Sequence, residues 1–275
     1  MMNRSINAIL VSLLILLAGP VWAAGVEVLW LGHATVKITS QEGKVIVIDP
    51  FLTINPKTPP KYRDLKALGK VDVILVTHGH RDHVIDLLEL AKLTDAKVVA
   101  TYSYVLNLVS LGLLDGEQVI GMNKGGTVSP IGRGIKIHMV PAEHASHLDL
   151  REFGLTQKFG GLRAIEGGVA VAYVVELENG FKIYHSGDTA VFGDMDLIHE
   201  FFEPDLAMVT IGGHFTMGPE GAAYAVKNLL KPKMVVPIHY GTFPVLNRTP
   251  AEFRAAMGQT EIEVLDLKPG ESLNF

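Results

Sequence analysis

THGHRDH, at residues 77–83, concentrates three histidines and one aspartate within the six positions from His78 to His83. The apolar run before it, residues 71–76 (VDVILV), predicts a buried strand, and residues 84–91 (VIDLLELA) predict a helix. The motif therefore lies where a strand passes into a helix. Ligands and catalytic groups collect at the carboxyl ends of strands in α/β folds, so this stretch indicates both a fold class and the place of a site.

The residue types in this motif favour a metal site over unrelated surface histidines. His78 and His80 are two positions apart, so in an extended segment both rings point to one side. Asp82 and His83 follow at the start of the predicted helix and offer a second pair of ligands. Imidazole and carboxylate are natural ligands of zinc and related ions. Because the chain has no cysteine, any metal site must consist of His, Asp and Glu.

The composition is that of a folded protein with a large core. The chain has 275 residues, of which 48% are hydrophobic and 19% charged, and its formal net charge is −5. The length fits one large domain or two modest ones, and we see no linker or short repeat between residues 24 and 275. A negative net charge argues against nucleic acid as the main partner.

The first 23 residues have the layout of a secretory signal peptide. Arg4 supplies a positive charge, residues 9–17 form a short apolar core, and Val21-Trp22-Ala23 precedes Ala24 like a small-residue cleavage site. The apolar core is shorter than the ~20 residues of a membrane span. We therefore expect a signal peptide at 1–23, a single domain at 24–275, and an exported, periplasmic or secreted protein. An uncleaved N-terminal membrane anchor is the alternative.

The rest of the chain starts with a strand meander and then alternates between strands and helices. This rhythm predicts an α/β layer architecture built as one duplicated domain. Residues 53–70, with three prolines, predict an exposed loop, and the glycine-rich residues 145–168 predict a long loop.

The expected strands are 26–31, 35–39, 44–48, 71–76, 97–101, 118–120, 134–140, 169–177, 181–184, 206–211, 234–238 and 262–265. The expected helices are 82–93, 105–114, 194–202, 220–230 and 250–257.

Further His and Asp residues directly follow predicted strands. Since strand ends can converge on one edge of the core, we expect one site made of His78, His80, Asp82, His83, His144, Asp188 and His239. A single catalytic ion needs only about three protein ligands. Seven candidates therefore favour two ions, which could activate a bridging hydroxide and polarise a carbonyl or phosphoryl oxygen.

The spacing His-x-His-x-Asp-His at 78–83, followed by His144, Asp188 and His239, resembles the metallo-β-lactamase superfamily. The segments WLGH (30–33), IDPF (48–51), YHSGDT (184–189), GGHFTMGP (212–219) and PIHY (237–240) are similar to a branch of predicted metal-dependent hydrolases. That branch is related to L-ascorbate phosphate lactonase and to phospholipase D-type enzymes acting on N-acyl phosphatidylethanolamine.

The resemblance implies a four-layer αββα sandwich with the site at one edge of its paired sheets. It also implies a partition of the ligands: His78, His80 and His144 for the first ion, Asp82, His83 and His239 for the second, and Asp188 as the bridge. We expect two divalent ions, zinc in the first place, with manganese or iron as alternatives.

For three further residues the sequence leaves two alternative roles open. Asp49 either orients a ligand imidazole or caps a turn; His33 either lines the pocket or is structural; Tyr240 either donates to an oxyanion or packs. His214 is our candidate proton donor to the leaving group, beside Asp82 and Asp188 as catalytic residues. We expect core or surface roles for the remaining candidates, His138, His147, His185 and His199, and an apolar wall from Phe215 and Met217.

These observations predict a metal-dependent hydrolase that cleaves an ester, lactone, amide or phosphodiester bond in a small-molecule or lipid substrate. One alternative is a phosphodiesterase or phospholipase D-type enzyme that works at a membrane surface. The other is a metal-binding or redox protein on the same fold without hydrolytic activity. We expect no nucleic-acid partner, and a homo-oligomer is compatible with the sequence.

Overall fold

The apolar run before the histidine motif forms strand β4 (Val73–Leu75) in the computed structural model, which describes residues 25–275. Val73 and Leu75 contribute to one hydrophobic cluster, whereas Ile74 and Val76 contribute to another. Alternate side chains of a strand point to opposite faces of its sheet, so β4 is covered on both faces. This explains why its sequence is a continuous apolar run.

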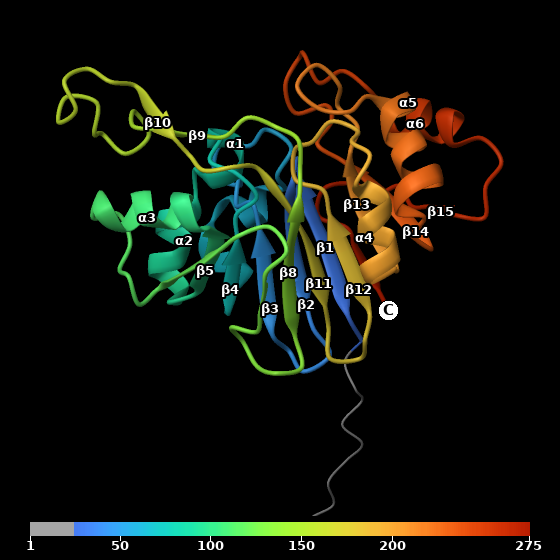
Figure 1. Ribbon diagram of the computed structural model, residues 1–275, viewed down its shortest axis with the longest axis horizontal. Helices are drawn as coiled ribbons and strands as arrows, with labels where there is room; N and C mark the ends of the chain where they lie inside the picture. The colour runs from blue at the N-terminus through green and yellow to red at the C-terminus, as the bar shows by residue number, and fades with distance from the viewer. Residues whose placement is uncertain (1–24) are drawn as a thin grey trace, which may run out of the picture.

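The strands form two sheets of seven strands each (Figure 1). The first has the order β16 (Ser272–Asn274), β1 (Glu27–Gly32), β2 (Thr35–Thr39), β3 (Val45–Ile48), β4, β5 (Lys97–Thr101) and β6 (Val119–Met122). The second has the order β15 (Glu263–Val264), β14 (Met234–Ile238), β13 (Leu206–Thr210), β12 (Lys182–His185), β11 (Val171–Glu176), β8 (Lys136–Pro141) and β7 (Thr127–Val128).

The sheets pack face to face, and helices cover their outer faces (Figure 1). The core between the sheets contains residues of both, such as Ile46 and Leu75 from the first and Met208 and Val236 from the second. One outer cluster joins the first sheet to α2 (Leu87–Thr94) and α3 (Tyr102–Ser110). The other joins the second sheet to α4 (Met195–Phe202), α5 (Pro219–Tyr224) and α6 (Pro250–Met257). These four layers confirm the αββα sandwich expected from the sequence.

The strand directions bring the functional loops to one edge. Strands β3, β4, β5 and β6 are parallel neighbours in the first sheet, and β12, β13, β14 and β15 are parallel neighbours in the second. Within each parallel set all carboxyl ends lie at the same edge, where α/β folds bind their ligands. The loops after β4, β12 and β14 carry histidines or aspartates at this edge.

The prediction of a single helix at 82–93 is wrong, because this segment forms two helices, α1 (Arg81–Val84) and α2. Asp86 interrupts it with a non-helical conformation (φ −98°, ψ 2°). Its buried carboxylate accepts hydrogen bonds from the backbone N–H groups of Leu52 and Thr53 and from the Thr53 hydroxyl. Such side-chain bonds to a neighbouring loop compete with the continuation of a helix.

Two segments expected to be loops are partly ordered by long-range contacts. Within 145–168, β9 (His147–Asp149) and β10 (Ala164–Glu166) pair as an antiparallel hairpin, which projects from the sandwich in Figure 1. Within 53–70, the short 3₁₀ helices η1 (Pro60–Arg63) and η2 (Leu65–Leu68) occur, and Leu65 and Leu68 are buried. The elements in both segments are only three or four residues long, so they leave too short a pattern in the sequence to be predicted.

Three further differences are smaller. The expected helix at 105–114 is α3, which begins and ends earlier in the chain. The expected helix at 220–230 is α5 followed by the π-helix η3 (Ala225–Leu230). Strands β7 and β16 were not predicted, because two- and three-residue strands leave too short a pattern in the sequence.

The predicted signal peptide at 1–23 lies outside the described residues, so export and the alternative membrane anchor remain predictions. Within residues 25–275, no helix has both the length and the apolar character that crossing a membrane requires.

One buried hydroxyl connects the two sheets directly. Tyr173 on β11 donates to the carbonyl oxygen of Val76, 2.9 Å away, and lies 3.2 Å from that of Val99. We expect Tyr173→Phe to lower the free energy of unfolding by about 1–2 kcal/mol, since it leaves buried carbonyls without this donor. Tyr184→Phe is the matched control: its buried hydroxyl has no hydrogen-bond partner among residues 25–275, so its removal should be neutral or stabilising. Urea unfolding of both variants measures the difference, and equal losses would contradict the role of Tyr173.

Candidate metal centre

The first group of candidate ligands comes from the motif and from the segment after β8. His78, His80 and His144 each offer one nitrogen, and these atoms lie within 4.8 Å of one another. The Nε2 of His78 is 3.0 Å from the Nδ1 of His80. Two nitrogens bound to one tetrahedral zinc at 2.0–2.1 Å are about 3.3 Å apart. The three rings are therefore already close to the arrangement that a shared ion requires.

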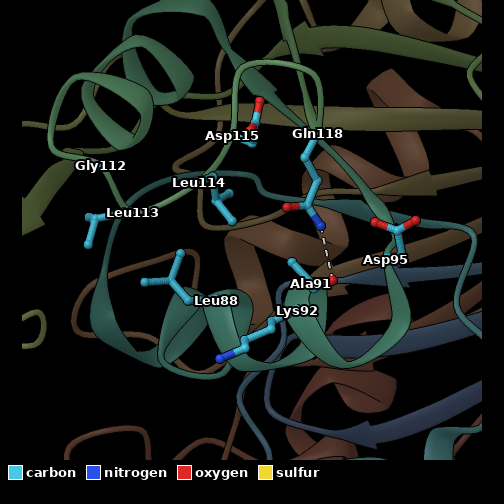
Figure 2. A pocket seen from close by; sticks show the side chains of 9 residues that line it. All are labelled: Leu88, Ala91, Lys92, Asp95, Gly112, Leu113, Leu114, Asp115 and Gln118. Atoms are coloured by element: carbon cyan, nitrogen blue, oxygen red, sulfur yellow. Dashed lines mark hydrogen bonds between the residues drawn. The ribbon is translucent and has the colours of Figure 1, made fainter.

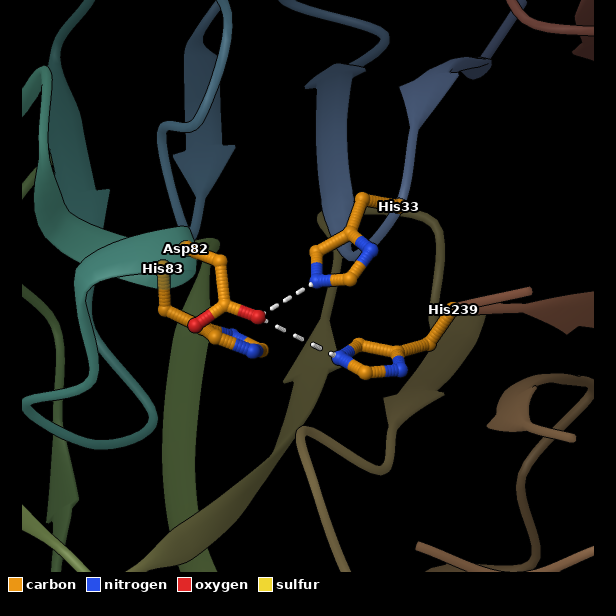
Figure 3. Close-up of side chains that lie close together, drawn as sticks. All are labelled: His33, Asp82, His83 and His239. Carbon is orange, nitrogen blue, oxygen red and sulfur yellow. Dashed lines mark hydrogen bonds and ion pairs between the residues drawn. The ribbon is translucent and has the colours of Figure 1, made fainter. Parts of the chain in front are cut away.

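A second group, drawn in Figure 3, lies beside the first, since the ring centroids of His78 and His83 are 4.1 Å apart. His33, Asp82, His83 and His239 each offer one ligand atom within the same 4.8 Å limit. Asp82 and His83 come from α1, His239 follows β14, and His33 lies in the turn between β1 and β2. The structure thus brings together the three residues expected at a second ion and adds His33 to them.

Asp188 lies between the two groups. Its Oδ1 is 3.1 Å from the Nε2 of His239 and 3.4 Å from the Nε2 of His83, whereas its Oδ2 is 3.6 Å from the Nε2 of His144. Each carboxylate oxygen therefore faces a different group. This is the position that a bridging carboxylate must occupy.

His33 is the member of the second group that sequence reasoning did not identify as a partner of the ligands. Its Nε2 is 2.9 Å from the Oδ2 of Asp82, its ring lies against that of His239 with centroids 3.7 Å apart and the planes tilted by 37°, and its carbonyl oxygen accepts from the backbone N–H of His239. Thr242 contacts its Nδ1, and the indole of Trp30 donates to its carbonyl oxygen. The sequence signals for His33 were its place after a strand and a glycine and its membership of the WLGH segment.

Asp49 contacts the imidazole of a candidate ligand, which favours the orienting role over the turn-capping role left open by the sequence. Its Oδ2 is 2.8 Å from the Nδ1 of His83, and the backbone N–H and hydroxyl of Thr77 donate to its two oxygens. Asp49 and His83 are completely buried. The pairing of an imidazole Nδ1 with a carboxylate leaves Nε2 free to bind a metal.

The electrostatics suit divalent cations. Burial and nearby imidazoles hold the pKa of His78 well below its ordinary value and lower the pKa of His80 to about 4, so both rings are neutral. Burial alone would raise the pKa of Asp82 and Asp188. A hydrogen bond from His33 lowers the pKa of Asp82, and facing imidazoles hold that of Asp188 well below its usual range. His78, His80 and the two carboxylates therefore have the protonation states that bind metal ions. Burial alone would lower the pKa of His83, but the carboxylates of Asp188 and Asp49 raise it well above its ordinary value, so a bound cation must displace a proton there.

Several buried polar atoms in this cluster have no hydrogen-bond partner within the described part of the chain. They are the Nε2 atoms of His80, His83 and His239, the Nδ1 of His239 and the Oδ1 of Asp188. Burying such atoms without partners is costly, so native proteins rarely leave several together. A metal ion accepts lone pairs from several of them at once. The donor set therefore fits the metal ions expected from the sequence, whereas their number and identity stay predictions.

A cavity of about 660 Å³ opens onto both groups. Among the candidate ligands, His80, Asp82, His144, Asp188 and His239 contribute to its walls. The remaining walls come from residues that sequence reasoning largely missed: Phe51, Ile54, Arg81, Ala145, His147, Asp149, Arg151, Phe215, Phe243 and Leu246. Only Phe215 was expected to form an apolar wall. The others come from α1, β9 and several loops, including the segments 53–70 and 145–168, and they meet only when the sheets pack, which no local pattern reveals.

Three other candidates lie apart from the two groups. His214 is exposed, its ring contacts Phe215, and it belongs to neither group, so its catalytic role stays a prediction. His185 is buried and binds the carbonyl oxygen of Ala34, as expected for a core residue. Tyr240 packs on Trp30 with ring centroids 5.5 Å apart, which favours the packing role over the oxyanion role.

The remaining histidines lie at several places. His147 is exposed on β9, and its ring centroid is 4.5 Å from that of His80, so it borders the site rather than lying away from it. His138 contacts Thr127 and Glu176 within the second sheet, and His199 lies on α4. Met217 is buried in the outer cluster with α4 and α5, so it does not form the expected cavity wall with Phe215.

A second cavity, of about 560 Å³, lies between α2 and the segment 112–118 (Figure 2). It shares no residue with the two ligand groups. The side-chain amide of Gln118 donates to the carbonyl oxygens of Ala91 and Ala96 and fastens this segment to the helix. We therefore interpret its polar contacts as structural.

Comparison with known proteins agrees with this geometry. Residues 44–240 match the family described as the beta-lactamase superfamily domain. A UPF0173 metal-dependent hydrolase from Cupriavidus necator is 50% identical over 94% of this chain and 89% of its own length, and a relative with the same description from Rubrobacter xylanophilus is 45% identical over 90% and 96%. The solved structure of Igni18, a metallo hydrolase from Ignicoccus hospitalis, superposes with a TM-score of 0.77 at 32% identity and covers 91% of this chain and 98% of its own.

The Asp49–His83 hydrogen bond makes a prediction about metal affinity. We expect Asp49→Asn to weaken zinc binding about 10- to 100-fold, because the amide orients the imidazole less strongly and cannot accept both Thr77 bonds. Competition with a chromophoric chelator measures the affinity. Asp72→Asn is the control, since Asp72 also accepts from a backbone N–H, that of Val45, but contacts no histidine. An unchanged affinity in Asp49→Asn would contradict the orienting role.

Proposed function

Because the chain belongs to the β-lactamase superfamily and is a metal-dependent hydrolase within it, we propose that it cleaves an ester, lactone, amide or phosphodiester bond at a centre of two divalent metal ions. The position of Asp188 carries this proposal. Its two oxygens face two separate ligand groups, and both groups open onto one cavity. The names of the relatives favour hydrolysis over the redox alternative.

We assign His78, His80 and His144 to one ion, Asp82, His83 and His239 to the other, and Asp188 to both. Bound divalent ions supply a water of lowered pKa and an electrophile for the substrate oxygen. Zinc suits this set of nitrogen and oxygen ligands, and manganese or iron is the alternative. His33 and Asp49 hold the second group in place through Asp82 and His83 respectively.

The chain's own residues account for the orientation of an attacking water. Asp82 has the most accessible carboxylate of the cluster, with 28% of its side chain exposed, against 4% for Asp188 and 0% for Asp49. Burial alone would raise the pKa of Asp82, but the hydrogen bond from His33 holds that pKa below its usual range, so Asp82 is ionised at neutral pH and can orient a water in the cavity by accepting a hydrogen bond from it. His33 holds its Oδ2 at 2.9 Å and fixes the direction of the carboxylate.

We expect the zinc-loaded protein to hydrolyse at least one member of a panel of p-nitrophenyl esters, aryl lactones, anilides and bis(p-nitrophenyl) phosphate. Chelation and Asp188→Ala should each reduce kcat/KM at least about a thousandfold, since both remove the stabilisation of charge in the transition state. Glu200→Ala, an exposed change on α4, should leave the rate unchanged. Turnover of no panel member by metal-loaded protein would overturn the proposed function.

Metal content tests the number of ions separately from activity. We expect two equivalents of zinc per chain after gel filtration, measured by inductively coupled plasma mass spectrometry. His144→Ala should retain about one equivalent, because it removes a ligand from the first group only. His199→Ala, a histidine on α4 outside both groups, should keep two. A native content of one equivalent under zinc saturation would contradict the two-ion centre.

A further inference from the structure

The cavity beside the candidate ligands has one strongly apolar side. Phe51, Ile54, Phe215, Phe243 and Leu246 contribute to it. Two of these side chains are exposed at the opening, Ile54 by 52% and Phe215 by 60%. Exposure of large apolar side chains is unfavourable in water unless something covers them, and at a concave site the natural cover is a ligand.

This apolar side is joined to the second ligand group. The rings of Phe51 and Phe243 stack with centroids 6.1 Å apart, and both meet the ring of His33 edge-on, at 5.4 and 5.5 Å. His33 in turn contacts Asp82 and His239. A group that lies against the two phenylalanines is therefore next to the predicted reaction centre rather than in a separate groove.

Another part of the cavity lining is charged but locally neutral. Arg81 forms an ion pair with Glu152 at 2.9 Å, and the Nε of Arg151 is 2.9 Å from the Oδ1 of Asp149. Each guanidinium thus has its own carboxylate partner. A binding site for a substrate with an anionic substituent needs arginines that are free to pair with it. The pairing on this side favours a substrate whose parts outside the reacting bond are uncharged.

We propose that the substrate is an uncharged acyl compound, an ester, lactone or amide, with an apolar acyl chain that lies against Phe51, Ile54, Phe215 and Phe243. This inference rests on the proposed function, from whose four bond types it removes the anionic phosphodiester. In the ester case the acyl C–O bond breaks, the oxygen of water forms the new bond to the acyl carbon, and the leaving alkoxide takes a proton from that water. A cavity of about 660 Å³ is within the range of small-molecule sites.

The test compares substrates whose acyl chains differ only in length. The zinc-loaded full chain is assayed with p-nitrophenyl acetate, butyrate, hexanoate and octanoate below their micelle concentrations, beside bis(p-nitrophenyl) phosphate. We expect kcat/KM to rise about two- to fourfold for each added methylene, because each one is buried against apolar side chains. Ile54→Ser and Phe215→Ser should each reduce this dependence to less than twofold per methylene. Phe201→Ser, which removes a side chain 75% exposed on α4 outside the cavity, should not change it.

The outcomes separate this inference from the proposed function. Hydrolysis of all four esters at equal kcat/KM, or faster hydrolysis of the phosphodiester than of any ester, would overturn the inference and leave a metal-dependent hydrolase. If no panel member is hydrolysed, the proposed function fails. The affinities of octan-2-one and butan-2-one for the zinc-loaded protein, measured by calorimetry, then test whether the cavity binds an apolar chain. Tighter binding of octan-2-one, weakened at least threefold in Phe215→Ser, supports apolar-chain binding, and equal affinities of the two ketones refute it.

Discussion

The buried carboxylate of Asp49 holds both ends of the histidine motif. It accepts from the backbone N–H and hydroxyl of Thr77, the first residue of the motif, and it lies 2.8 Å from the Nδ1 of His83, the last. A charged group at this depth is stable only when its oxygens are paired, so the motif and Asp49 fix each other. The left-handed backbone of Asp49 (φ 49°) is tolerated for the same reason, because these bonds determine its conformation.

The site depends on contributions from both sheets. The motif follows β4 of the first sheet, whereas His144, Asp188 and His239 follow β8, β12 and β14 of the second. Neither sheet could assemble the two groups alone. The apolar core between the sheets therefore does more than stabilise the fold, because it sets the separation at which Asp188 faces histidines from both halves.

The two sides of the cavity give the centre a chemical preference that its ligands cannot supply. Histidine and aspartate ligands are suited to several hydrolytic reactions, and related folds place similar residues around different substrates. Here Phe51 and Phe243 lie against His33, and the two arginines that line the same cavity are already paired with carboxylates. Specificity in this arrangement belongs to the loops after the strands, as is general for sites mounted on a rigid scaffold.

The sequence by itself determined the strand–helix rhythm and the seven candidate ligands, because these follow apolar strands and local pattern reveals strand ends, whereas the αββα sandwich was expected from the resemblance of its motifs to a known family. It did not determine the break at Asp86, the β9–β10 hairpin, the contacts of His33 or the apolar side of the cavity. These depend on residues far apart in the chain, such as Asp86 with Leu52 and His33 with Asp82. Only the packing of one sheet on the other fixes such distances, so only the tertiary structure could decide which polar groups find partners and which remain free to bind an ion.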